Sequence, residues 1–421
     1  MKNRILLCLA HMSGKEQDFI KEAFDTNWVV PLGPNVNGFE KDLEDFVNRS
    51  EGDAALDKKV VALSAGTAAV HLALIACGVK SGDEVLVQSF TFCASSHPIA
   101  YLGATPVFID SERKTWNMDP DLLEEAIKDR IAKTGKKPKA IIPVALYGMP
   151  YRIDRIMEIA DRYGIPVIED AAEGFGSRFN GQVLGTFGEY GVLSFNGNKM
   201  ITTSGGGALI CPDAEKAREI LWYATQARES YPYYQHEAIG YNYRMSNICA
   251  GIGRGQMTVA DEHIAHHKHV QALYEELLAD VKGITMHKAP GKEFDSNYWL
   301  CTATLDPDLR IKGQELAYKQ VVAGAVGGAA GVTHTVDSAT TDCQPNDNVE
   351  ALRMALDAAN IEARPLWKPM HKQPVYKNAP AYVNGVSEEL FKVGICLPAG
   401  PWVTDDDIRY IVESIKAAII N

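Results

Sequence analysis

Short apolar segments alternate with helix-like segments between residues 60 and 210. The apolar segments are rich in Val, Ile and Leu and are short, as buried β-strands are. They read VVAL (60–63), EVLVQS (84–89), PVFI (106–109), AIIPVALYG (140–148), IPVIED (165–170) and GVLSF (191–195). Strands that alternate with helices predict an α/β fold with a mostly parallel sheet covered by helices.

Helix-end signals support this alternation. Asp119 followed by Pro120 is a typical helix start, because Asp caps the first turn and Pro fits the first helical position. Gly164 ends the helix before IPVIED, since glycine adopts the left-handed conformation found at helix ends. The predicted elements are therefore bounded by residues suited to their ends.

The pattern changes after about residue 255. A long helical stretch, 259–281, is followed by a predicted strand, YWLCTATL, a helix–strand segment, VEALRMALDAANIEARPLW, and a closing amphipathic helix, TDDDIRYIVESIKAAI. We predict a large domain with an N-terminal arm at 1–255 and a smaller α+β domain at 256–421. Periodicity is weak between 321 and 348, within a longer stretch, 306–348, that we interpret as an insertion.

Composition narrows the class of protein. A chain of 421 residues favours two domains, and the formal charge of −12 argues against a general nucleic-acid or anionic membrane surface. Eight scattered cysteines without a C-x-x-C pair favour a reducing cytoplasm. The apolar start ends at Ala10, which is short for a signal peptide, and no later segment is long and apolar enough to span a bilayer.

Asp170 and Lys199 follow two predicted strands, where α/β sheets bind ligands. Pyridoxal phosphate needs this pair: a lysine holds its aldehyde as a Schiff base, and a carboxylate keeps its pyridine nitrogen protonated. Taken singly, Lys199 is more often a solvated side chain and Asp170 a helix cap. Ser194 and the Gly205–Gly207 run beside Lys199, which permits close backbone packing, favour the cofactor interpretation.

The segment LSAGTAAVHLAL indicates a strand, a turn of small residues and a helix. Free N–H groups at Gly66, Thr67 and Ala68 are suited to hold a phosphate, although an ordinary N-capped helix explains the same pattern. It is not a P-loop, because G-x-x-x-x-G-K-[ST] is absent. Phe92 follows the next strand and is placed either to stack on a flat ring or to pack in the core.

Two further groups carry weaker signals. His263, His266, His267 and His269 lie on the long helix, but no H-E-x-x-H motif is present, so a solvated helix face is preferred to a metal site. The aromatic run 231–234 suits a packed or interface loop better than a base-stacking platform.

Motifs along nearly the whole chain resemble the DegT-like sugar aminotransferases, fold type I pyridoxal phosphate enzymes with a seven-stranded-type sheet. The matching motifs are HMSG, WVVPLGPNVNGFE, GTAAVHLAL, SFTF, LYG, EDAAEGFGS, LSFNGNK, GYNYR, RPLWKPMH and GICLPAG. Within the family, SFNGNKMITTSGGG, TQARE and ARPLWKPMHKQPVY are most similar to enzymes that aminate UDP-linked 4-keto-6-deoxy-N-acetylglucosamine on the way to bacillosamine.

The resemblance implies a role for each matching residue. Lys199 and Asp170 are the catalytic pair, Glu173 borders the ring hydroxyl and Phe92 stacks on the ring. The implied phosphate ligands are Gly66, Thr67, Ala68, Ser194 and, from a second subunit, Asn242. The implied substrate ligands are Arg228, Arg364, Lys368 and His371. A homodimer with glutamate as amino donor follows.

The resemblance leaves alternatives open. A GDP-linked 4-keto sugar or a 3-keto sugar is the nearest rival substrate. The related dehydratases carry His at the lysine position, and a regulatory protein would need an additional module. Three departures from many relatives stand out: TTSGGG after Lys199, Glu173 in place of Gln, and the long stretch 306–348.

Overall fold

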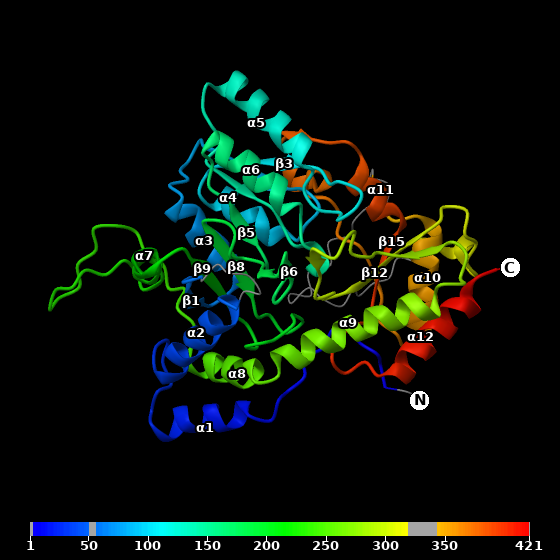
Figure 1. Cartoon of the computed structure of the whole chain (residues 1–421), viewed down its shortest axis with the longest axis horizontal. Coiled ribbons are helices and arrows are strands. Elements are labelled where there is room, and N and C mark those ends of the chain that lie inside the picture. Colours follow the sequence, from blue (N-terminus) through cyan, green and yellow to red (C-terminus); the bar gives the residue numbers. More distant parts are fainter. Residues whose placement is uncertain (1–2, 50–55, 319–342, 421) are drawn as a thin grey trace.

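The computed structural model describes residues 3–49, 56–318 and 343–420 (Figure 1). The helices are α1 (Glu16–Asp25), α2 (Pro34–Val47), α3 (Gly66–Ala76), α4 (His97–Tyr101), α5 (Pro120–Thr134), α6 (Ile153–Tyr163), α7 (Ala214–Ala224), α8 (Asn247–Met257), α9 (Ala260–Leu277), α10 (Asp347–Ala358), α11 (Val386–Val393) and α12 (Asp405–Ala418). Residues 321–342 of the predicted weakly periodic segment, 321–348, lie outside the described residues.

The strands form one large sheet, one small sheet and a short three-stranded sheet with the order β11-β6-β7. They are β1 (Lys59–Leu63), β2 (Glu84–Gln88), β3 (Thr105–Ile109), β4 (Ala140–Ile142), β5 (Ile168–Asp170), β6 (Arg178–Phe179), β7 (Gln182–Val183), β8 (Tyr190–Ser194), β9 (Gly207–Cys211), β10 (Ile284–Met286), β11 (Phe294–Asp295), β12 (Cys301–Leu305), β13 (Arg364–Pro365), β14 (Ala381–Tyr382) and β15 (Gly394–Leu397).

The large sheet has the order β1-β9-β8-β5-β4-β2-β3, with the short β14 added beside β3. Parallel bridges Ile141–Val167 and Val144–Asp170 join its two halves. Strand β9 runs antiparallel to both neighbours, and the other pairings are parallel. The predicted α/β fold with a mostly parallel sheet is confirmed.

Successive residues of the sheet strands point to opposite faces, and each face is buried against helices. In β1, Val60 and Ala62 join the cluster that contains residues of α2, α5, α6 and α8. Val61 and Leu63 join the cluster that contains residues of α3, α4 and α7. Burial on both faces explains why these strands are continuously apolar in the sequence.

The predicted helix ends are confirmed. Asp119 accepts hydrogen bonds from the backbone N–H groups of Asp121 and Leu122, and Pro120 opens α5. Gly164 ends α6 in the left-handed conformation. The closing helix α12 begins with a capping box between Thr404 and Asp407.

A second hydrophobic core forms where the small sheet, β10-β12-β15-β13, packs against α9, α10 and α12 (Figure 1). Helix α9 runs from beside α8 to α12. Phe294, Trp299 and Leu366 nevertheless pack in the first cluster, and β14 pairs with β3. The division of the chain at residue 255 therefore remains a prediction. None of the described helices is both long and apolar enough to cross a bilayer.

The solvated helix face expected for the helix histidines is wrong for His263 and His267, which are buried, whereas His269 is exposed. His267 is completely buried, and its Nδ1 donates to the carbonyl of Tyr298 at 3.1 Å. His263 Nδ1 lies 3.3 Å from the carbonyl of Met200, and His269 pairs with Asp405. Within the described residues, no group of three or more His, Cys, Asp or Glu side chains is arranged to hold a metal ion.

We predict that acid destabilises the protein through His267. Burial lowers the pKa of His267 to about 3, whereas the unfolded chain has a pKa of about 6.5. Below pH 6.5 the unfolded state binds a proton that the folded state does not, so the free energy of unfolding falls toward pH 3. The slope from this group is about 1.4 kcal/mol per pH unit.

Urea unfolding at several pH values measures this slope. His267→Gln should flatten it between pH 6.5 and 4.5, while His236→Gln, at an exposed position, should not. Equal slopes in the wild type and His267→Gln would contradict the prediction.

Candidate active site

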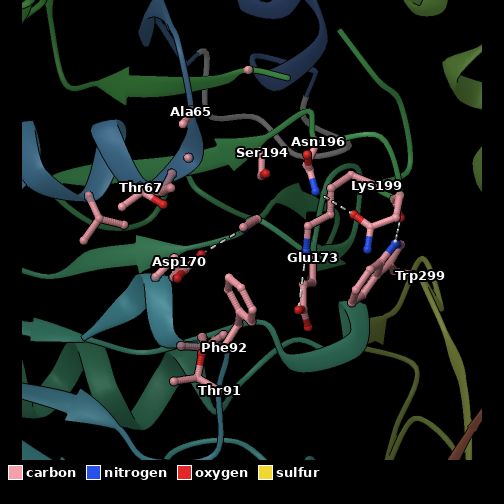
Figure 2. A pocket seen from close by; sticks show the side chains of 18 of the residues that line it. Ala65, Thr67, Thr91, Phe92, Asp170, Glu173, Ser194, Asn196, Lys199 and Trp299 are labelled. Atoms are coloured by element: carbon pink, nitrogen blue, oxygen red, sulfur yellow. Dashed lines mark hydrogen bonds and ion pairs between the residues drawn. The ribbon is translucent and has the colours of Figure 1, made fainter. Parts of the chain in front are cut away.

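A cavity of about 420 Å³ opens at the carboxyl edge of the large sheet. Segments that follow β1, β2, β5 and β8 contribute to its wall, and one wall comes from the chain before β12 (Figure 2). The lining residues are Ser64, Ala65, Gly66, Thr67, Val70, Thr91, Phe92, Ala94, Val144, Asp170, Ala172, Glu173, Val192, Ser194, Asn196, Asn198, Lys199, Gly205, Gly206, Trp299 and Trp367.

The structure brings most of the predicted cofactor residues together. Those that line the cavity are Gly66, Thr67, Phe92, Asp170, Glu173, Ser194 and Lys199. Ala68 is buried in the first turn of α3 and does not line it. Asn242 is exposed and lies outside it, at a position predicted to serve a second subunit. The roles of these residues remain predictions.

Asp170 ends β5 with its carboxylate buried at the cavity wall. Its Oδ2 accepts a hydrogen bond from Ser95 Oγ at 2.6 Å, and its Oδ1 accepts one from the Ala172 N–H at 3.1 Å. Burial raises the pKa of Asp170, and these hydrogen bonds and Lys199 lower it in part. A buried carboxylate of this kind is stabilised strongly when a cation enters the cavity.

Lys199 reaches the cavity from the loop after β8. Its Nζ lies 3.4 Å from Glu173 Oε1 and 3.9 Å from the centroid of the Trp299 ring. Glu173 Oε2 accepts a hydrogen bond from the Tyr147 N–H at 2.7 Å. Burial raises the pKa of Glu173, and the charge of Lys199 opposes this shift. Lys199 and Glu173 thus form a nearly buried ion pair.

The first turn of α3 faces the same cavity with free N–H groups. Its cap residue, Ala65, makes no side-chain hydrogen bond to the helix. A Cβ atom on Gly207 would lie 2.4 Å from Gly66 N and 2.5 Å from Ala65 C. Glycine is therefore required where β9 passes the start of α3, and the close packing at this position is against the backbone of Ala65 and Gly66. Gly205, in contrast, faces open space.

Two aromatic side chains lie at the mouth of the cavity. Phe92 is 49% exposed, and its ring centroid lies 5.3 Å from that of Trp367. The backbone N–H of Trp367 donates to the hydroxyl of Tyr147 at 2.8 Å. Because Phe92 is not part of the core, the stacking role is favoured for it over core packing.

The predicted substrate ligands lie outside the cavity lining. Arg228 is exposed with its guanidinium 4.1 Å from the Tyr234 ring centroid, and Arg364 is exposed and paired with Glu362. Lys368 is half-buried. His371 has Nδ1 at 2.7 Å from Ser89 Oγ and Nε2 at 3.1 Å from Glu388 Oε1. The structure does not bring these four side chains together.

Several residues of the site carried no assigned role in the sequence. Asn196 and Asn198 precede Lys199 within the SFNGNK motif, which was a signal available for them. Ser95 lies in the SFTFCAS segment, three residues after Phe92. Trp299 is a hundred positions from Lys199 in the chain, and no local pattern connects the two.

Comparison with known proteins identifies the chain. The model of the DegT/DnrJ/EryC1/StrS aminotransferase family matches residues 11–329 and 314–416. The chain belongs to this family. It is therefore a pyridoxal phosphate-dependent sugar aminotransferase, as the motifs indicated.

Individual relatives extend over almost the whole chain. A putative pyridoxal phosphate-dependent aminotransferase, EpsN of Bacillus subtilis, is 43% identical over 98% of this chain and 95% of its own. The GDP-perosamine synthase of Escherichia coli O157:H7 is 33% identical over 96% of both. The crystal structure of a DegT DnrJ EryC1 StrS aminotransferase from Brucella abortus is 27% identical, with a TM-score of 0.80 over 96% of this chain and 95% of that one.

The residues of this DegT family aminotransferase fit the cofactor chemically. The uncapped start of α3 and the glycine that permits its close packing suit the phosphate group. Asp170 suits a protonated ring nitrogen, because a cation beside its buried carboxylate would stabilise the charged form. Lys199 supplies the amine, and Phe92 supplies an exposed aromatic face.

We predict that Gly207→Ala disturbs the start of α3. The added methyl group would overlap the backbone of Ala65 and Gly66, so the free energy of unfolding should fall by about 1–3 kcal/mol. The displaced N–H groups should also weaken pyridoxal phosphate binding by about tenfold or more. Urea unfolding and cofactor titration measure the two effects.

Gly205→Ala is the matched control, because nothing lies within 4 Å of the position that its methyl group would occupy. Its stability should remain within about 0.5 kcal/mol of the wild type. Equal stability of the two variants would contradict the packing argument.

Proposed function

We propose that this DegT family enzyme transfers an amino group from glutamate to the C4 ketone of a UDP-linked 4-keto-6-deoxy-N-acetylhexosamine. The product is the corresponding UDP-4-amino-4,6-dideoxy-N-acetylglucosamine-type sugar. One observation carries the reaction type: Lys199, Asp170 and the uncapped start of α3 converge on one cavity. This arrangement can hold a phosphorylated, protonated pyridine ring beside a lysine amine.

Lys199, Asp170 and Glu173 each have a distinct role in this reaction. Bound pyridoxal phosphate supplies a ring that accepts electrons from the carbon losing a proton. Lys199 Nζ takes the proton from the donor Cα and later returns one to the sugar C4. Asp170 holds the proton on the ring nitrogen, and Glu173 lies 3.4 Å from the amine, where it balances positive charge on Lys199.

The UDP-sugar preference is supported by the motifs around the catalytic lysine. The segments SFNGNKMITTSGGG and ARPLWKPMHKQPVY, with Glu173 in place of Gln, resemble the UDP branch of the family. A Pseudomonas aeruginosa relative named UDP-2-acetamido-2-deoxy-3-oxo-D-glucuronate aminotransferase is 37% identical over 59% of this chain. We propose Arg228, Arg364, Lys368 and His371 as substrate ligands from the same resemblance.

A GDP-linked 4-keto-6-deoxy sugar is the second candidate substrate. Three GDP-perosamine synthases, from Escherichia coli, Caulobacter vibrioides and Vibrio cholerae, are 30–33% identical over almost their whole length. These matches cover more of this chain than the match to the P. aeruginosa relative does. UDP-linked and GDP-linked sugars should therefore be tested side by side.

We also propose a homodimer with shared active sites. Figure 1 shows the segment after α7 projecting from the rest of the fold. Its side chains Tyr231, Tyr233, Tyr234 and Ile239 are 46%, 59%, 76% and 83% exposed, respectively. Apolar surface of this kind favours burial against another chain. Asn242, the proposed phosphate ligand for a second subunit, lies three residues after Ile239. All eight cysteines are free thiols, which supports the proposed cytoplasmic location.

We predict that Lys199→Ala retains the fold but loses the covalent attachment of the cofactor. Borohydride treatment of the wild type should fix pyridoxal phosphate on the peptide that contains Lys199, as mass spectrometry of a digest can detect. The variant should show no such peptide and should lose aminotransfer by about 10⁴-fold or more. Lys216→Ala, on the surface of α7, is the control. Cofactor fixed on another lysine would contradict the assignment.

We predict that a UDP-linked 4-keto-6-deoxy-N-acetylhexosamine is aminated and that the GDP-linked 4-keto sugar is a poorer substrate. Mass spectrometry of reactions with glutamate measures both products and the 2-oxoglutarate released. A preference of about tenfold or more corresponds to a single well-placed polar contact. Faster amination of the GDP sugar would overturn the substrate while leaving the reaction type intact.

A further inference from the structure

The amine of Lys199 has two neighbours of different kinds. Glu173 Oε1 lies 3.4 Å from Nζ, which is longer than the 2.7–2.9 Å typical of a charge-assisted hydrogen bond. The Trp299 ring centroid lies 3.9 Å from Nζ, well within the range of a cation–π contact. Figure 2 shows Glu173 and Trp299 on the side of the cavity occupied by Lys199, away from Asp170 and Thr67.

The indole ring of Trp299 is held rigidly. Its Nε1 donates to the carbonyl of Asn198 at 2.7 Å, next to Lys199 in the chain, and the residue is 2% exposed. Tyr298 adopts a positive φ of 48°, which bends the backbone just before Trp299. A side chain fixed at both its backbone and its polar end presents one defined face to the cavity.

One buried amide connects the two neighbours of Lys199. Asn297 Oδ1 accepts from the backbone N–H of Trp299 at 2.8 Å, and Asn297 Nδ2 donates to the backbone carbonyls of Glu173 and Phe175 at 3.0 and 2.9 Å. Asn297 is completely buried. Asn297 therefore links the backbone at Glu173 to the backbone at Trp299.

We propose that Trp299 is a positioning residue that receives the Lys199 amine whenever that amine is not bonded to the cofactor. A lysine carries four flexible methylene groups, and its ion pair with Glu173 is long, so the carboxylate alone leaves the amine loosely held. The indole face of Trp299 contacts Nζ in addition to Glu173 and keeps the amine within the cavity between proton transfers. The role in catalysis rests on the proposed function of Lys199, but the contact itself does not.

Chemical labelling of Lys199 tests this contact without the cofactor. The full chain, freed of pyridoxal phosphate, is treated with a limiting amount of an amine-reactive acetylating reagent, and digestion with mass spectrometry follows each lysine peptide. Trp299→Leu removes the aromatic face, and Lys199 should label about three- to tenfold faster. Trp299→Phe keeps a weaker face and should fall between Trp299→Leu and the wild type.

Two controls separate positioning from general loosening. The remaining lysine peptides of the same digest should label at wild-type rates, and Trp402→Leu, which removes an exposed tryptophan elsewhere, should leave the labelling rate of Lys199 unchanged.

The kcat of Trp299→Leu for aminotransfer should fall by about tenfold, with the KM for the sugar changed less than about twofold.

Wild-type labelling of Lys199 in both Trp299 variants would overturn the proposal, as would an unchanged kcat in a Trp299→Leu protein that labels faster. If Trp299→Leu does not fold, the comparison of Trp299→Phe with the wild type decides. Loss of the borohydride-fixed peptide at Lys199 in the wild type would instead refute the proposed function and leave the labelling result intact.

Discussion

The site depends on two carboxylates that are buried together with one lysine amine. Asp170 and Glu173 are each 5% exposed, and burial raises the pKa of both. Charges in such a place are costly unless cations and hydrogen bonds compensate them. Lys199 compensates Glu173 directly, whereas Asp170 relies on Ser95 and Ala172. The protonated ring of pyridoxal phosphate would supply the missing cation, so cofactor binding and charge balance are the same event.

The sheet explains how these groups meet. Asp170 ends β5 and Ser194 ends β8, and these neighbouring parallel strands place both loops at one edge. The antiparallel β9 then returns past the start of α3, where Gly207 permits contact between backbones. Tyr147 adopts a positive φ of 53°, its backbone N–H donates to the Glu173 carboxylate, and its hydroxyl accepts from the backbone N–H of Trp367. Strained backbone at such a point is typical of functional sites, where the surrounding fold holds it in place.

Local patterns predicted the parts of the site that depend on local structure. Asp170 and Lys199 were identified because strand ends are visible in the sequence, and Gly66 and Thr67 because the turn before a helix is visible too. Trp299 was not identified from the sequence, because a hundred residues separate it from Lys199 in the chain and their contact depends on the bend at Tyr298. Strand β12 begins at Cys301, after this bend, whereas the predicted strand YWLCTATL begins at Tyr298. His371 remains a predicted substrate ligand, and its ring nitrogens lie beside Ser89 and Glu388, the latter on α11. No local pattern reveals this pairing.

The central claim is that Asp170 remains ionised in the complex and keeps the cofactor nitrogen protonated. The most direct measurement is the ¹⁵N chemical shift of the ring nitrogen in enzyme loaded with ¹⁵N-labelled pyridoxal phosphate. We expect the shift of a protonated pyridine in the wild type and that of an unprotonated one in Asp170→Asn. An unprotonated ring nitrogen in the wild type would contradict the claim.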